Sequence, residues 1–259
     1  MKNIIITGGP TNEYIDEVMK ITNMSTGSLS TALAKCFLGA GYRVFAIFNH
    51  SVSTEKIEDM MAGQGIPEDS FRYYGIETTE DMINAFEGVR EDMEKDGLHC
   101  DGVIHAAAVG DYKGEFSFLL EDMAEELFAA KDTAGSAADF LAIMENPKCK
   151  LNDDTKISSY QKNLTAKLTL TPKVIANLRE WFPDSLLIGC KLLEGVTKEE
   201  LYAVATKLAA KNSMDFIMAN DLADLRKGRM TRHICTPEGF TGIELDSPEA
   251  IFEFINSRI

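Results

Sequence analysis

Three apolar runs near the N-terminus, with a helical segment between the first two, constrain the fold of this sequence most strongly. They are "NIIIT" (3–7), "RVFAIF" (43–48) and "DGVIHAAA" (101–108), each typical of a strand buried in a parallel sheet. Between the first two, apolar residues recur at helical spacing from Leu29 to Ala40. This strand–helix–strand order predicts a doubly wound α/β fold.

The second half continues the same alternation, with further strands expected at 185–193 and 215–221. We therefore predict a Rossmann-like, mostly parallel sheet that ends in a C-terminal hairpin. The other expected elements are a helix from about Thr79 to Lys95, a short helix capped by Thr171 and Pro172 that ends near Trp181, a helix from a T-x-x-E capping box at Thr197 to about Asn212, hairpin strands at 232–235 and 242–245, and a last helix capped by Ser247.

One segment, from Tyr112 to Thr155, does not fit this alternation. It is acidic and rich in alanine, with helical spacing and no obvious strand. We interpret residues 113–155 as a helical insertion, or flap, within a single domain of residues 1–259.

The composition limits the possible ligands. With 26 basic and 41 acidic residues, the formal net charge of −15 argues against nucleic acid and anionic membranes as partners. No apolar run approaches the roughly 20 residues of a membrane span. The five cysteines are scattered and form no C-x-x-C pair, which argues against disulfides and zinc and favours a reducing cytoplasm.

An anionic ligand would need a local positive patch in so acidic a chain. The segment "KISSYQKNLTAKL" supplies Lys156, Lys162 and Lys167. A solvated edge strand that carries protective lysines explains the same pattern equally well.

A long connection follows the first predicted strand. Gly8 and Gly9 allow backbone amides to approach an anion, although a plain tight turn also uses such glycines. The connection to the helix is about 20 residues long, where such loops usually have about 2–6. Its end, from Asn23 to Gly27, combines an amide, two hydroxyls and free helical N–H groups, which is typical of an anion-binding site. The alternative is a capped helix without a ligand.

Polar residues also end two other predicted strands. In "HAAAVGDY", Ala107 and Ala108 would let a flat base approach the sheet, and Asp111 could hold Mg²⁺ on a triphosphate. A turn or a helix cap is the alternative role for this aspartate. "MANDL" places Asn220 and Asp221 at another carboxyl end, where ligands of such folds gather.

An ordinary dinucleotide fold is disfavoured. The sequence lacks G-x-G-x-x-G, and its second strand ends in "FNH" without an acidic residue for a ribose. It also lacks a Walker lysine after Gly9, and Tyr160 does not begin a Y-x-x-x-K motif.

Taken in order, these segments resemble the phosphopantothenate–cysteine ligase family, in the stand-alone form of this coenzyme A pathway enzyme. The matching motifs span residues 4 to about 221: "TGGPTNEYIDEV", "ITNMSTG", "AAAVGDY", "KISS", "LTLTPKVI", "IGCKLLEGVT" and "MANDL".

The resemblance implies a ligase unrelated to ATP-grasp enzymes, which couples 4′-phosphopantothenate to cysteine in two steps. A nucleoside triphosphate, CTP in bacterial members and ATP in eukaryotic ones, first activates the carboxylate with release of pyrophosphate. The cysteine amine then displaces the monophosphate. It also implies Mg²⁺, a cytoplasmic homodimer and small-molecule partners, with the insertion reaching toward the other subunit's site.

The resemblance also implies roles for individual residues. Asn23 would secure the acyl intermediate, and Lys156 would contact the triphosphate. Asp111 would serve the nucleotide and the metal, and Lys20 the substrate. The remaining expected nucleotide contacts are Gly8, Gly9, Ser25, Thr26, Gly27, Ala107, Ala108, Cys190, Lys191 and Asn220.

Several residues depart from the family pattern. Met19 replaces an arginine, Ser28 a basic residue, Ser30 a glycine and Cys190 a phenylalanine. These changes keep open the alternative of a non-catalytic relative of the ligase. A nucleotide-cofactor oxidoreductase of Rossmann type is a separate alternative, against which the missing acidic residue counts.

Overall fold

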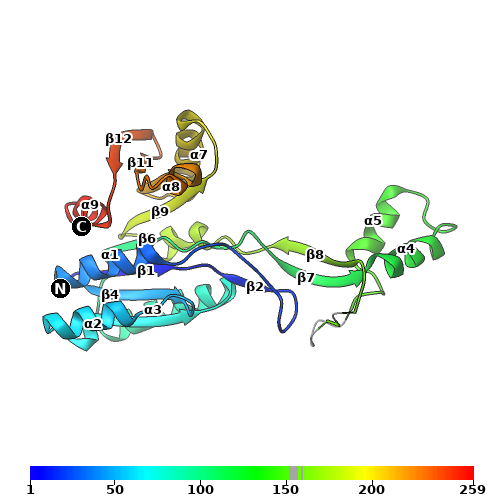
Figure 1. The fold of residues 1–259 in the computed structure, drawn as a ribbon, viewed down its shortest axis with the longest axis horizontal. Helices are drawn as coiled ribbons and strands as arrows, with labels where there is room; N and C mark the ends of the chain where they lie inside the picture. Colours follow the sequence, from blue (N-terminus) through cyan, green and yellow to red (C-terminus); the bar gives the residue numbers. More distant parts are fainter. Residues whose placement is uncertain (152–156, 159) are drawn as a thin grey trace. The chain divides into compact units, whose positions relative to one another are not determined.

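The computed structural model describes residues 1–151, 157–158 and 160–259 (Figure 1), and the chain divides into two compact units. We call them the sheet unit and the insertion unit. The sheet unit consists of Met1–Thr11, Asn23–Val109 and Lys173–Ile259. The insertion unit consists of Asn12–Thr22 and Gly110–Pro172, so it takes in part of the first long connection as well as the expected insertion.

The sheet unit is built on one eight-stranded sheet, whose strands in spatial order are β12 (Gly239–Leu245), β11 (Arg232–Thr236), β10 (Phe216–Asp221), β9 (Leu186–Leu193), β6 (Gly102–His105), β1 (Asn3–Gly8), β4 (Arg43–Asn49) and β5 (Phe71–Ile76). The strands from β10 to β5 are parallel, and the β11–β12 hairpin is antiparallel. The chain runs outward from β1 to β5 and then returns to β6 on the other side of β1. The switch point of the sheet therefore lies between β1 and β6.

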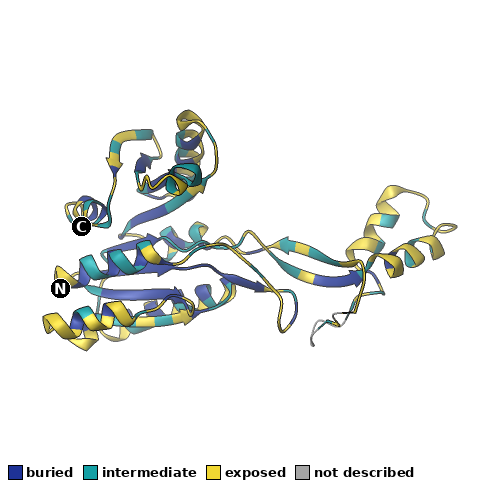
Figure 2. Cartoon of the chain, viewed as in Figure 1, coloured by how far each residue is buried: buried dark blue, intermediate teal, exposed yellow. Residues whose placement is uncertain are grey.

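Helices cover both faces of this sheet, as the alternation along β1 requires. Ile4 and Ile6 join one hydrophobic core and Ile5 joins the other, because successive side chains of a strand point to opposite faces. Figure 2 shows β1 and β4 buried. The first core contains α1 (Ser28–Gly39), α2 (Glu55–Gln64) and α9 (Pro248–Asn256), and the second contains α3 (Thr79–Lys95), η2 (Val174–Ala176), α6 (Leu178–Trp181) and α7 (Lys198–Lys211).

The insertion unit contains two antiparallel strand pairs and two helices. Its small core gathers Phe116, Phe118 and Met123, with Leu127 and Cys149 against it. The elements are the pairs β2 (Asn12–Tyr14) with β3 (Lys20–Thr22) and β7 (Tyr112–Leu119) with β8 (Leu164–Leu170), and the helices α4 (Leu120–Ala129) and α5 (Ala137–Glu145).

The doubly wound, mostly parallel sheet with a helical insertion and a C-terminal hairpin is confirmed. Two local expectations were wrong. The segment after Tyr112 begins with a strand, β7, because Phe116 and Phe118 alternate into the core of the insertion unit. Thr171 does not cap a helix, because its hydroxyl donates to the Gly110 carbonyl. The elements that were not anticipated include α2 and β5.

Two short helices complete the description, η1 (Glu68–Ser70) before β5 and α8 (Leu222–Arg226) after β10. Among the described residues, no helix combines the length and the apolar character that crossing a membrane requires.

Candidate functional site

The candidate site lies at the switch point of the sheet unit, where the residues after β1 and β6 are joined by backbone hydrogen bonds. The Ala108 N–H donates to the Gly9 carbonyl at 2.9 Å, and the Thr11 N–H donates to the Ala108 carbonyl at 3.2 Å. Pro10 and Ala108 form a parallel bridge. The structure thus brings the predicted Gly8–Gly9 turn and the Ala107–Ala108 segment together, at the edge where ligands of such sheets bind.

Asn23 holds this junction from the other end of the long connection. Its side-chain amide donates to the carbonyl oxygens of Ala108 and Val109, both at 3.2 Å. Its own carbonyl accepts from the Ser25 N–H at 2.9 Å. The side chain predicted to contact the reacting acyl group is therefore anchored at the switch point, although the residue is exposed.

The start of α1 lies against the same turn. Gly27, the N-cap residue, has φ of 69°, and a Cβ placed there would lie 2.5 Å from Val52 Cγ2 and 3.2 Å from the Gly9 nitrogen. Gly9, with φ of 82°, meets the same valine at 2.6 Å. Both glycines are thus explained by close packing on Val52, and their contact with a ligand stays a prediction.

The α1 N-terminus has the properties of an anion-binding end. Among the described residues, the N-cap position, Gly27, has no side-chain cap hydrogen bond. The Ser28 N–H has a long contact of 3.4 Å to Thr26 Oγ1. The first turn carries no acidic residue, so its N–H groups and the helix dipole favour an anion.

Thr7 and His105 form a buried contact next to the switch point, which the sequence did not reveal. Thr7 Oγ1 accepts from the Ala107 N–H at 3.0 Å and lies 3.0 Å from His105 Nδ1. The contact between the Thr7 hydroxyl and Nδ1 forms with either atom as the donor, according to the tautomer of the imidazole. Burial lowers the pKa of His105 to about 4, so the imidazole is neutral near physiological pH.

The ends of β9 and β10 contribute a second group at the same edge of the sheet. Register places Cys190 beside Met218 and Lys191 beside Ala219, and Asn220 follows one residue later, 8% exposed. Burial raises the pKa of the Cys190 thiol to about 11, so the thiol remains protonated and is a poor nucleophile.

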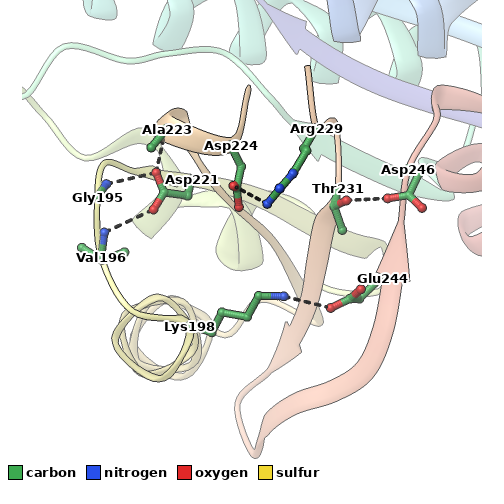
Figure 3. A network of polar contacts seen from close by, with 10 residues as sticks. All are labelled: Gly195, Val196, Lys198, Asp221, Ala223, Asp224, Arg229, Thr231, Glu244 and Asp246. Atoms are coloured by element: carbon green, nitrogen blue, oxygen red, sulfur yellow. Dashed lines mark hydrogen bonds and ion pairs between the residues drawn. The ribbon is translucent and has the colours of Figure 1, made fainter. Parts of the chain in front are cut away.

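Asp221 has a structural role here, which Figure 3 shows. Its carboxylate accepts from the N–H groups of Gly195 at 3.0 Å, Ala223 at 2.7 Å and Val196 at 3.2 Å. These bonds lower the pKa of Asp221 and fasten the loop after β9 to the start of α8.

The other predicted site residues lie in the insertion unit or outside the described residues. Asp111 is exposed and directly precedes β7, and its backbone carbonyl accepts from the Thr171 N–H. Lys20 is exposed at the start of β3. Lys156 lies outside the described residues. The adjacent Ile157 donates its N–H to the buried carboxylate of Asp16 at 3.0 Å, within the insertion unit.

The convergence of Asn23, Asp111 and Lys156 remains a prediction. Chain geometry alone keeps the Asp111 Cα within about 7 Å of that of Val109, whose carbonyl Asn23 contacts, because only one residue separates them.

Comparison with known proteins places this geometry in context. Residues 1–117 match the family model of the DNA/pantothenate metabolism flavoprotein C-terminal domain. The chain is 28% identical over 221 residues to the coenzyme A biosynthesis bifunctional protein CoaBC of Thermococcus kodakarensis, covering 85% of this chain and 41% of that protein. It is 26% identical to CoaBC of Bacillus subtilis over the same share of this chain and 40% of that protein. The chain thus spans about two fifths of the length of these relatives.

Solved structures agree with these matches. The DNA/pantothenate metabolism flavoprotein of Streptococcus pneumoniae superposes with a TM-score of 0.74 at 27% identity, over 100% of this chain and 98% of that one. A Cab2 mutant in complex with phosphopantothenate-cysteine shares the fold, with a TM-score of 0.67 at 16% identity over 99% of this chain and 86% of that one. The resemblance seen in the motifs is therefore confirmed, and the chain is similar to the DNA/pantothenate metabolism flavoprotein C-terminal domain over residues 1–117.

Proposed function

We propose that the chain is a phosphopantothenate–cysteine ligase. The observation that supports this proposal most directly is Asn23, whose amide is fixed by two carbonyls at the switch point beside the uncapped start of α1. An acyl-transfer enzyme that works without a protein nucleophile needs fixed polar groups at its reacting centre. The CoaBC proteins, named for coenzyme A biosynthesis, provide independent support.

In the proposed reaction the 4′-phosphopantothenate carboxylate attacks the α-phosphorus of a nucleoside triphosphate. An acyl–phosphate bond forms and pyrophosphate leaves. The cysteine amine then attacks the acyl carbon, the acyl–oxygen bond breaks, and the nucleoside monophosphate leaves as the amine loses its proton. Asn23 would hold the acyl group, and the N–H groups of α1 would stabilise phosphate charge.

Mg²⁺ fits the donor groups that this chain offers. Among the described residues, no group of three or more metal-ligating side chains occurs, and Asp111 is a single exposed carboxylate. Mg²⁺ in nucleotide enzymes is commonly held by one or two carboxylates together with phosphate oxygens. Asp111 would be that carboxylate, Lys156 would contact the triphosphate, and the ion would neutralise phosphate charge.

CTP is the nucleotide we favour, and a cytoplasmic homodimer is the form we expect. All five cysteines are free, which suits a reducing compartment. A dimer through the insertion unit would scatter light at twice the monomer mass at micromolar concentration. A monomeric mass would contradict this assembly.

An oxidoreductase is poorly supported, because the position that binds the ribose in dinucleotide folds has another role. Asn49, at the end of β4, is fully buried, and its side chain accepts from the Ser51 N–H at 2.9 Å and donates to the Glu77 carbonyl at 3.5 Å.

The ligase proposal is tested by combining each of the four triphosphates with each acceptor and identifying products by mass. We expect pyrophosphate release only with 4′-phosphopantothenate, and the coupled product only when cysteine is added. Absence of pyrophosphate with all four triphosphates would overturn the proposal and leave a non-catalytic relative.

Asn23→Ala tests the residue that supports the proposal. We expect turnover to fall by about 10²-fold, since loss of the bonds to the Ala108 and Val109 carbonyls would shift the groups at the reacting centre, and a displacement of about 1 Å has that effect. Asn256→Ala is the matched control, because it also removes an asparagine side chain that forms a hydrogen bond. Asn256 lies on α9, and its side-chain carbonyl accepts from the Tyr42 hydroxyl. Equal turnover in the Asn23 variant and the wild type would contradict the assigned role.

A further inference from the structure

Ser30 joins the start of α1 to the end of β1. It is the third residue of α1 and 1% exposed, and its hydroxyl donates to the Thr7 carbonyl at 2.9 Å. A buried hydroxyl is unfavourable unless it forms a hydrogen bond, and this one is satisfied. The bond joins residues 23 positions apart, so it ties together two elements that the long connection separates.

Close packing surrounds this bond. A Cβ placed on Gly8 would lie 2.6 Å from Ser30 Cβ and 2.7 Å from Ser30 Oγ. The Ser30 side chain therefore fills the space beside the last residue of β1 and leaves room there for a glycine only. The family that the motifs resemble has a glycine at position 30, which carries no hydroxyl, so this contact is a property of the present chain.

Thr7 connects the Ser30 hydroxyl to the candidate site. While the Thr7 carbonyl accepts from Ser30, the Thr7 hydroxyl accepts from the Ala107 N–H at 3.0 Å. Ala108 follows, and its carbonyl accepts from the Asn23 amide at 3.2 Å. The first turn of α1, the end of β1 and the segment after β6 are thus held through one residue, next to the backbone to which Asn23 is bonded.

We propose that Ser30 is a positioning residue of the ligase. By holding Thr7, it keeps Ala107, Ala108 and the Asn23 amide in the geometry of the reacting centre. This inference rests on the proposed function and deepens it. A displacement of about 1 Å at a reacting centre can lower a rate by about 10²-fold, so a buried bond this close to the site affects turnover.

Ser185 provides a matched control. It lies directly before β9, at the opposite edge of the sheet, is 4% exposed, and its hydroxyl donates to the Cys100 carbonyl at 2.7 Å. Ser30→Ala and Ser185→Ala thus each remove one buried hydroxyl that donates to a backbone carbonyl. Thermal unfolding should show a similar fall in melting temperature for both variants, of about 2–4 °C.

Steady-state ligation of 4′-phosphopantothenate and cysteine tests the inference. We expect Ser30→Ala to lower kcat by about 10- to 100-fold and to change each KM by less than about 3-fold, because the displaced groups act mainly in the transition state. Ser185→Ala should retain the wild-type kcat. Wild-type kcat in Ser30→Ala would overturn the inference. An equal fall in both variants would assign the effect to lower stability and would overturn it as well.

Hydrogen exchange followed by NMR tests the proposed route without requiring activity. Ser30→Ala should accelerate exchange of the Ala107 and Ala108 amides by about 3- to 10-fold, because Thr7 is held less firmly. Ser185→Ala should leave those two amides unchanged. Lost turnover with unaltered exchange would mean that Ser30 acts by another route, which also overturns the inference.

The two measurements separate this inference from the ligase proposal. If exchange rises in Ser30→Ala and the wild type releases no pyrophosphate with any triphosphate, the link from Ser30 to Ala107 stands and the ligase fails. If the wild type ligates and Ser30→Ala matches it, the ligase stands and the inference fails. Unaltered exchange in an inactive protein overturns both.

Discussion

At the scale of single residues, the buried Thr7–His105 contact sets the chemistry of the switch point. The Thr7 hydroxyl accepts from the Ala107 N–H at 3.0 Å and also forms a hydrogen bond with His105 Nδ1 at 3.0 Å. The neutral imidazole therefore holds the hydroxyl that fixes the backbone leading to Ala108, to which Asn23 is bonded. His105 is in this sense a positioning residue.

The first prediction concerns how this histidine makes stability depend on pH. The pKa of His105 is lowered from 6.5 to about 4, so between these values the unfolded chain binds a proton that the folded chain excludes. The free energy of unfolding is therefore fully maintained above about pH 6.5 and falls by up to about 3 kcal/mol as the pH approaches 4. Urea unfolding at a series of pH values measures this loss.

His105→Asn is the informative comparison, because an asparagine amide can form a hydrogen bond with the Thr7 hydroxyl in either direction without titrating. The variant should lose stability less steeply than the wild type between pH 6.5 and 4. His233, whose pKa burial also lowers, keeps part of the slope in both proteins. Identical slopes would show that His105 is protonated in the folded state at mildly acidic pH.

At the scale of elements, α1 and the turn after β1 are joined through a glycine that tolerates no substituent. Gly27→Ala would place an alanine in the left-handed conformation that Gly27 adopts, which lowers the free energy of unfolding by about 1–2 kcal/mol. The added methyl group would also overlap Val52, at a cost of about 1–3 kcal/mol more. Gly41→Ala is the matched control, since its φ is 82° but no atom lies within 4 Å of its added Cβ. Urea unfolding should show that Gly41→Ala lowers the free energy of unfolding only by the backbone contribution of about 1–2 kcal/mol.

The double variant Gly27→Ala/Val52→Ala isolates the overlap. A double-mutant cycle should show a favourable coupling of about 1 kcal/mol or more, because the shortened valine makes room for the new methyl group. Strict additivity would mean that close packing on Val52 does not dictate this glycine.

A third prediction concerns the loop after β9, which Asp221 fastens. Asp221→Ala should increase amide hydrogen exchange at Gly195 and Val196, whose N–H groups lose their acceptors. Asp246→Ala, which removes an exposed bond from the Thr231 hydroxyl, should leave those amides unchanged. Unaltered exchange in the Asp221 variant would show that backbone packing alone holds the loop.

Most elements of the sheet unit could be predicted because their signals are local. The Thr197 capping box and the Ser247 cap are formed as expected, since each bond joins residues three apart. Thr171 was misassigned because its partner Gly110 lies 61 positions away. Strand β7 was missed because the helical composition of α4 dominated the segment that contains both.

The candidate site was predictable only where a motif carried it. Asn23, Gly27, Ala107 and Ala108 stand in recognisable motifs, and the structure brings them to one edge. Thr7 and His105 are 98 positions apart, and no sequence motif predicts a contact between residues so far apart.

At the scale of the whole molecule, the two units differ in how much core they possess. The sheet unit has an extensive core on each face of its sheet, whereas the core of the insertion unit is built around Phe116, Phe118 and Met123. Helix α5 has no buried residue. We therefore predict that α5 exchanges its amide hydrogens through local opening, while β1 and β4 exchange only through global unfolding.

Native-state hydrogen exchange followed by mass spectrometry measures this difference. Low urea concentrations should leave exchange at α5 nearly unaffected and should steadily accelerate exchange at β1. Equal dependence on urea in both segments would mean that the two units unfold together.

The bridge between Pro10 and Ala108 has a consequence for how such proteins diversify. The insertion unit consists of two segments, or excursions from the sheet unit. Both begin next to this bridge, one after Thr11 and the other after Val109. Either excursion could therefore be lengthened or shortened without breaking the strand pairing of the sheet or its two hydrophobic cores.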